Sequence, residues 1–190
     1  MKRNRMFVPM QDAYFDMTPT KFEEYSLQLL REQFYGAENL KIEHNVIEKA
    51  IDGNYQIDGI ITFTQGGFNF KILVECKHYR SSISREKITV LYDKLRALNA
   101  HKGIFISSSN YQKGAIQYAT EHKISLVQLV PANTNKPLLR LNKIVNHISF
   151  YNNGEPYIGV LQSFDTSLHI ETLQSPNKIL NQIITKENSF

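Results

Sequence analysis

The alternation of apolar and polar residues in the first half of the chain predicts one helix followed by three strands. Thr18-Pro19 is typical of a helix start, with Thr18 as the N-cap, and apolar residues then recur at helical spacing as far as Gly36. Asp52-Gly53 and Gly66-Gly67 are typical of hairpin turns. They separate three strand-like runs, at residues 42–51, 57–64 and 68–77. A three-stranded antiparallel meander is therefore expected.

The second half of the chain alternates helix and strand. Ser84 is the predicted N-cap of a helix with one apolar face, which carries Ile88, Leu91, Leu95 and Leu98. A strand at 103–106, a helix that buries Ala115 and Ala119, and a strand at 124–130 follow. This alternation is typical of right-handed crossovers between parallel strands. The sequence therefore predicts an α/β fold, with a mixed β-sheet flanked by helices.

A domain boundary is expected in the turn-rich segment from Pro131 to Pro137. Residues 1–17 are expected to form an N-terminal arm, and residues 18–130 the main domain. In residues 138–190, a small C-terminal extension, residues 144–150 and 157–161 flank a turn like a hairpin, and residues 179–184 are a predicted helix. Because the main domain is complete without it in this interpretation, the extension is expected to serve dimerisation or partner binding.

Composition favours a soluble cytoplasmic protein. The chain has 190 residues and a formal net charge of +4, which permits nucleic acid as a partner without demonstrating it. Cys76 is the only cysteine, so intrachain disulfides and cysteine-based zinc clusters are excluded. No apolar stretch approaches the roughly 18 residues of a membrane-spanning helix. Polar residues and Pro9 follow the basic start where a signal peptide would be apolar.

Three charged residues lie at the ends of two neighbouring predicted strands. Glu75 and Lys77 interrupt an apolar strand two positions apart, so they project to one side and Cys76 to the other. Asp58, on the preceding strand, adds a second carboxylate. Hard divalent cations prefer carboxylate and carbonyl oxygens, so Asp58, Glu75 and the Cys76 carbonyl are candidate ligands of magnesium, with manganese as an alternative. Lys77 would orient or deprotonate a water for phosphodiester hydrolysis.

Four motifs carry a more specific signal: Phe22-Glu23, Gln56-Ile57-Asp58-Gly59, Val74-Glu75-Cys76-Lys77, and Lys113-Gly114-Ala115 with Tyr118-Ala119. Together they resemble the PD-(D/E)xK nuclease superfamily, and within it the catalytic domain of Mrr-like restriction endonucleases, over roughly 18–130. Ile57 stands where the superfamily motif has proline. The resemblance implies an αβββαβ core and magnesium-dependent cleavage of DNA, as in type IV restriction of foreign or modified DNA. Because one active site cuts one strand, double-strand cleavage would need two sites, most simply in a homodimer, and a separate specificity subunit is a further candidate partner.

Glu23 has two interpretations. It matches the helical acidic residue that many members of the superfamily place beside the metal. If Thr20 were the helix cap, Glu23 would instead complete a capping box with the main chain. With Thr18 as the cap, Glu23 lies deeper in the helix and its carboxylate is available to the site.

Candidate DNA contacts surround the predicted active site. Arg80 follows the strand of Glu75 and Lys77, where a DNA backbone would pass. Ser108 and Ser109 precede a helix N-terminus, where main-chain N–H groups favour anions, and Lys113 adds charge to the first turn. A further basic track is conceivable on four other residues, Lys87, Lys94, Arg96 and Lys102, although such residues usually form the solvated face of a helix.

Other functions remain compatible with these residues. Glu75 and Lys77 could be a surface pair on an edge strand, with Asp58 in a turn. A repair or recombination nuclease acting on branched DNA would use the same three groups. A DNA-binding module of this fold without catalysis is the third alternative, although such a module has no reason to retain all three charges.

Overall fold

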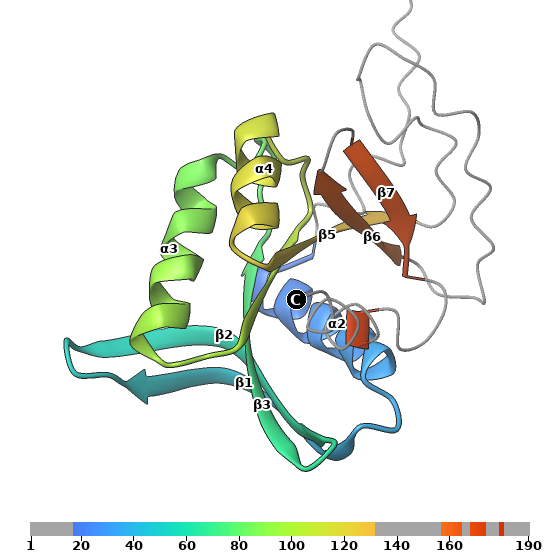
Figure 1. Ribbon diagram of the computed structural model, residues 1–190. Coiled ribbons are helices and arrows are strands. Elements are labelled where there is room, and N and C mark those ends of the chain that lie inside the picture. The colour runs from blue at the N-terminus through green and yellow to red at the C-terminus, as the bar shows by residue number, and fades with distance from the viewer. Residues whose placement is uncertain (1–16, 132–156, 165–167, 174–178, 181–190) are drawn as a thin grey trace, which may run out of the picture.

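The computed structural model describes residues 17–131, 157–164, 168–173 and 179–180. Within these residues, seven strands form one sheet in which chain order and spatial order coincide (Figure 1). The strands are β1 (Glu38–Lys49), β2 (Asn54–Gln65), β3 (Phe68–Lys77), β4 (Lys102–Ser107), β5 (Ile124–Pro131), β6 (Tyr157–Phe164) and β7 (Leu168–Thr172). The helices are α2 (Pro19–Gln33), α3 (Arg85–Ala97) and α4 (Lys113–Glu121).

The sheet is mixed, as the sequence predicts. β1, β2 and β3 form the antiparallel meander, and Gly66 and Gly67 make the β2–β3 turn at φ of 58° and 82°, which glycine adopts without strain. β3, β4 and β5 are parallel and are joined through α3 and α4. The prediction of an α/β fold with a mixed sheet and flanking helices is confirmed.

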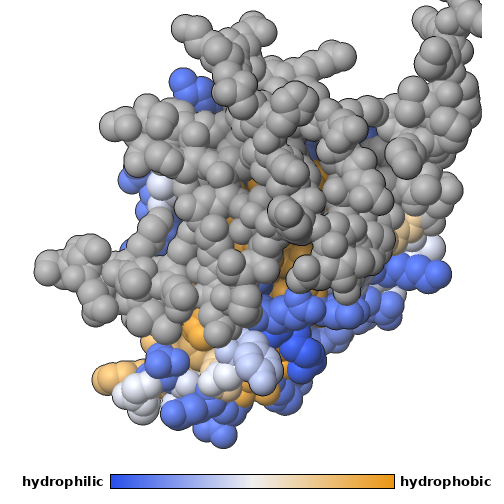
Figure 2. Space-filling view, turned by 90° about the vertical axis from the view of Figure 1, so that its right-hand side faces the viewer, coloured by the Kyte–Doolittle hydropathy of each residue, from blue (hydrophilic) through white to orange (hydrophobic). Residues whose placement is uncertain are grey.

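Helices cover both faces of the sheet. α3 and α4 lie together on one face and α2 lies on the other (Figure 1). The α2 face buries a cluster that includes Phe22, Leu30 and Val74, and the opposite face buries Ile60, Leu73 and Leu91. In a view turned towards the side of β6 and β7, hydrophobic residues are visible near the middle of the face, with hydrophilic residues beside them (Figure 2). β3 is buried without interruption from Ile72 to Cys76, because helical layers enclose the sheet on both faces.

Thr18 is the N-cap of α2, and its hydroxyl accepts a hydrogen bond from the N–H of Lys21 at 3.2 Å. The helix start expected from Thr18-Pro19 is confirmed, and Glu23 lies in the helix beyond the capping residues. Ser84 stands at the N-cap of α3 but its side chain makes no capping hydrogen bond.

β6 and β7 extend the same sheet beyond β5. β6 pairs antiparallel with β5 and with β7, and a buried hydrogen bond joins Gln162 to Gln128 at 3.0 Å. Gln33 of α2 donates to the carbonyl of Leu173 and accepts from the N–H of Ile179, at 3.3 and 3.4 Å. The described part of the expected extension 138–190 thus packs into the core of the domain, because β5 would otherwise be an open edge. The domain boundaries themselves stay predictions.

Parts of the expected extension lie outside the described residues. Of the predicted hairpin, the strand at 144–150 and its turn are not described, whereas 157–161 lies in β6. Of the predicted helix at 179–184, residues 179 and 180 are described and both are helical. The arm at 1–17 is described at Met17 alone. Across the described ranges, no helix combines the length and apolar character needed to cross a bilayer.

Candidate active site

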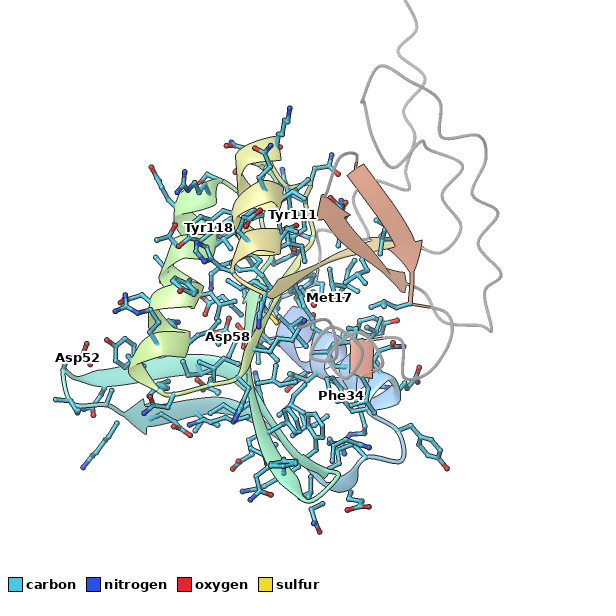
Figure 3. All side chains as sticks on the ribbon, viewed as in Figure 1. Met17, Phe34, Asp52, Asp58, Tyr111 and Tyr118 are labelled. Atoms are coloured by element: carbon cyan, nitrogen blue, oxygen red, sulfur yellow. The ribbon has the colours of Figure 1, made fainter. Side chains whose placement is uncertain are left out.

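The site lies where β2 separates from β3. β2 pairs with β3 from Gln65 back to Gly59 and then continues with β1 alone. Asp58 is the first residue of β2 beyond this pairing, and its Oδ2 accepts a hydrogen bond from the main-chain N–H of Cys76 at 2.8 Å. Figure 3 labels Asp58 in the interior beside this fork, whereas Asp52 lies at the tip of the β1–β2 hairpin. The divergence of the strands makes room for a carboxylate at the sheet.

Lys77 brings the two predicted carboxylates together. Its Nζ lies 2.5 Å from Oε1 of Glu75 and 3.5 Å from Oδ2 of Asp58. The side chains are largely buried, at 24% exposure for Lys77, 15% for Asp58 and 8% for Glu75. The structure therefore places Asp58, Glu75 and Lys77 in one cluster, on two neighbouring strands, and not on an exposed strand edge.

Burial and mutual repulsion perturb the ionisation of this cluster. Burial and the charge of Glu75 raise the pKa of Asp58, against the opposing effects of the Cys76 N–H and Lys77. Burial by itself would lower the pKa of the Lys77 amine, but Glu75 and Asp58 outweigh it and raise that pKa above its usual value. A carboxylate that ionises with difficulty beside a second carboxylate is a site that a cation would stabilise.

Glu23 is directed to the β1 side of the site. Its Oε2 lies 2.8 Å from Nε2 of His44, and both side chains are about three-quarters buried, at 24% and 30% exposure. The negative charge of Glu23 contributes to the raised pKa of Asp58, so the two carboxylates influence each other. The helix start at Thr18 leaves Glu23 free of the capping box, and its carboxylate bonds to His44 instead.

Cys76 projects away from the charged cluster. Its side chain is 5% exposed and belongs to the core beneath α2, and burial raises the pKa of the thiol well above its usual value. The thiol is therefore a buried core group. The main-chain carbonyl of Cys76 is the group that the sequence suggests as a ligand.

The donor set fits a hard divalent cation. Carboxylate oxygens of Asp58 and Glu75 both lie within 3.5 Å of one lysine nitrogen. No group of three His, Cys, Asp or Glu side chains in the described part of the chain has the spacing of a metal centre. The expected set has two carboxylates and a main-chain carbonyl, with water completing the coordination that magnesium requires. The chemistry of the oxygens and the repulsion between them agree with this set.

Ser108 and Ser109 have main-chain partners in the loop after β3. The hydroxyl of Ser108 donates to the carbonyl of Tyr79 at 2.9 Å, and that of Ser109 donates to the carbonyl of Ser81 at 2.6 Å. Both residues are buried, at 7% and 9% exposure. Because a phosphate needs donors and these hydroxyl protons are already used, the structure assigns the two serines to holding the loop 79–81.

Arg80 and Lys113 lie in two segments that are joined just before α3 and α4 begin. Arg80 is in the loop between β3 and α3, and Lys113 is the first residue of α4. A parallel bridge between Ile83 and Tyr111 brings the starts of α3 and α4 side by side, and neither helix has a side-chain cap. Two helix N-termini beside basic residues favour anions at this edge of the sheet.

Two residues at the site were not expected from the sequence. Lys94 of α3, expected only as part of a basic track, donates to Oε2 of Glu75 at 2.8 Å. Its position between Leu91 and Leu95 on the apolar stripe was the available signal. His44, the partner of Glu23, has no comparable signal, because its approach depends on how α2 packs across β1.

A family model described as restriction endonuclease, the Mrr catalytic domain, matches residues 15–131. The chain belongs to the Mrr-type restriction endonuclease family. The match covers the strands and helices from α2 to β5, which include every residue of the cluster described above. The predicted resemblance to Mrr-like catalytic domains is confirmed.

The chain is similar to parts of three other proteins. The type IV methyl-directed restriction enzyme EcoKMrr of Escherichia coli strain K12 is 26% identical over 103 residues, 54% of this chain, and the chain spans about a third, 32%, of that protein. The MspJI restriction endonuclease in complex with a 27-mer oligonucleotide has a TM-score of 0.46 and 18% identity, over 62% of this chain and 28% of that one. The protein of unknown function AF1548 has a TM-score of 0.46 and 17% identity, over 60% and 56%.

Proposed function

We propose that the protein is a magnesium-dependent endonuclease that hydrolyses phosphodiester bonds of DNA, in restriction of foreign or modified DNA. The observation that carries this proposal is the shared contact of Asp58 and Glu75 with the Lys77 ammonium, at 3.5 and 2.5 Å. Membership of the Mrr-type family supports the class of reaction, and the methyl-directed activity named for the Escherichia coli relative supports modified DNA as the target.

Asp58, Glu75 and the Cys76 carbonyl would hold the cation. When bound, a divalent cation polarises the phosphate and lowers the pKa of a bound water. Manganese would satisfy the same oxygens. Glu23, whose charge acts on Asp58, is assigned to the site together with Asp58, Glu75 and Lys77.

We assign Lys77 to stabilisation of the transition state. Its ammonium stands between two carboxylates, which keep it protonated, since they raise its pKa. A charged donor at this place can orient the attacking water and offset the charge that develops on the phosphate. The carboxylates hold the lysine in position before DNA binds, so this stabilisation needs little rearrangement.

DNA binding is assigned to the edge of the sheet at which α3 and α4 begin. Arg80 and Lys113 would contact phosphates there, supported by the helix N-termini. Ser108 and Ser109 would act indirectly, because they hold the loop that carries Arg80. Double-strand cleavage would require two copies of the site, most simply in a homodimer, and a separate specificity subunit is the proposed source of target selection.

The experiment is cleavage of supercoiled plasmid, methylated or unmethylated, with magnesium or with chelator. Asp58→Ala should abolish cleavage, and Asp93→Ala, which removes a carboxylate that is 66% exposed on α3, should leave it unchanged. Branched substrates in the same assay test the repair alternative. Cleavage that persists in chelator, or in Asp58→Ala, would overturn the proposal, and DNA binding without any cleavage would favour a non-catalytic module.

A further inference from the structure

Lys94 of α3 turns its side chain inward, to the candidate active site. Its Nζ donates to Oε2 of Glu75 at 2.8 Å and to the main-chain carbonyl of Gln56 at 3.0 Å, and the side chain is 16% exposed. An ammonium is strongly hydrated and its flexible stem usually keeps it in water. The two hydrogen bonds therefore show that the Lys94 ammonium is held within the protein and does not belong to the solvated face of α3.

We propose that Lys94 is a positioning residue, which fixes both cation-binding carboxylates of the site. The proposal rests on the proposed function, because it gives Asp58 and Glu75 the role of cation ligands. Glu75 meets a different lysine at each oxygen, Lys77 at Oε1 and Lys94 at Oε2. With Oε2 held from α3, Oε1 can pass from Lys77 to a cation without loss of the orientation of the carboxylate.

The second bond of Lys94 acts on the strand of Asp58. Gln56 precedes Asp58 by two residues, in the part of β2 that no longer pairs with β3. The bond from Lys94 to the Gln56 carbonyl therefore joins this segment to α3, where the hydrogen bonds between β2 and β3 have ended. One ammonium thus connects the segment of Asp58 with the carboxylate of Glu75, and it restrains the distance between them.

Positioning and simple electrostatics predict opposite results. Lys94 carries a positive charge, so its removal would strengthen the binding of a cation if charge were its only influence. If Lys94 orients the ligands, its removal weakens cation binding. Outer partners of metal ligands typically change affinity by about 10- to 100-fold.

The test compares Lys94→Met, which keeps the apolar stem, with Lys94→Arg, which keeps charge and donors. Mn²⁺ is titrated calorimetrically into the whole protein without DNA. We expect about tenfold weaker binding in Lys94→Met, partial recovery in Lys94→Arg, and no change in Lys87→Ala, which alters an exposed lysine of the same helix. Unchanged or tighter binding in Lys94→Met would overturn the role. No Mn²⁺ binding by the unmodified protein would count against the proposed function instead.

A second readout needs no metal. Amide hydrogen exchange of Cys76 reports on the bond to Asp58, since that N–H donates to its carboxylate. In Lys94→Met we expect faster exchange at Cys76, with the amide of Ile106 in the neighbouring β4 unchanged. Equal acceleration at both amides would make Lys94 a residue of general stability, and no change at Cys76 would show that it does not position Asp58. Either outcome contradicts the proposal.

Discussion

The main-chain N–H of Cys76 donates to Oδ2 of Asp58 at 2.8 Å, and this bond joins two strands where their ladder has ended. The carboxylate takes the place of a carbonyl partner from β2. As a result, Asp58 is fixed beside Glu75 and Lys77 by the main chain and not by side-chain packing alone. The site is thus preformed, although its carboxylates repel each other.

Asp58→Asn should stabilise the metal-free protein at neutral pH while it abolishes cleavage. The pKa of Asp58 is raised from 3.8 by burial and by Glu75, so the folded state binds this proton more tightly than the unfolded chain. That contribution is fully present below pH 3.8 and is lost as the pH rises through the folded value. The gain in Tm of Asp58→Asn should therefore be larger at pH 7 than at pH 3.5, in thermal unfolding with chelator.

Magnesium supplies the control for this prediction. Because the proposed cation site requires the Asp58 carboxylate, added magnesium should raise the Tm of the wild type and leave that of Asp58→Asn nearly unchanged. If Asp58→Asn were less stable than the wild type at pH 7 without metal, this would contradict the destabilising effect that we assign to the ionised Asp58 carboxylate.

Lys77→Ala should lose cleavage and keep DNA binding. An interaction that is stronger in the transition state than in the bound substrate acts on the rate and little on affinity. We expect a fall in single-turnover rate of at least about 100-fold, with a binding constant within about threefold of wild type, measured by fluorescence anisotropy in calcium. Cleavage at a near-normal rate would show that Lys77 belongs to the scaffold.

Arg80→Ala and Lys113→Ala should weaken DNA binding across all sequences. Each variant should also reduce the slope of log K against log salt by about one counterion, because each would remove one proposed phosphate contact. Lys41→Ala is the matched control, since Lys41 is 66% exposed on β1 and pairs with Glu43. A salt slope that stays at the wild-type value would place the DNA path elsewhere.

Gly59→Ala should destabilise the protein by about 1–3 kcal/mol, the usual cost of overpacking. A Cβ at Gly59 would lie 2.4 Å from Cδ2 of Leu27 and 3.3 Å from Cβ of Val74, so the Leu27 side chain of α2 would have to shift within the core. Urea unfolding measures the difference. Gly114→Ala is the control: its Cβ would meet nothing within 4 Å, and alanine favours the helix α4. Equal stability of the two variants would contradict the close packing of α2.

Much of the fold could be predicted because its signals are local. The Thr18 cap, the Gly66-Gly67 turn and the apolar stripe of α3 each depend on residues within a few positions of one another. The two-residue spacing of Glu75 and Lys77 likewise places their side chains on one side of β3, and the structure shows them in contact. β6 and β7 were not expected to extend this sheet, because pairing with β5 depends on contacts distant in sequence.

The sequence by itself determined the order of helices and strands from α2 to β5, and it identified the charged residues that those strands carry. Only the tertiary structure decided their partners: Lys94 at Glu75, His44 at Glu23, and the Cys76 amide at Asp58. The physical reason is that a strand or helix period specifies the side to which a residue projects. Which group meets it there depends on where β2 leaves β3 and on how α2 and α3 cross the sheet, and these are properties of the packed chain.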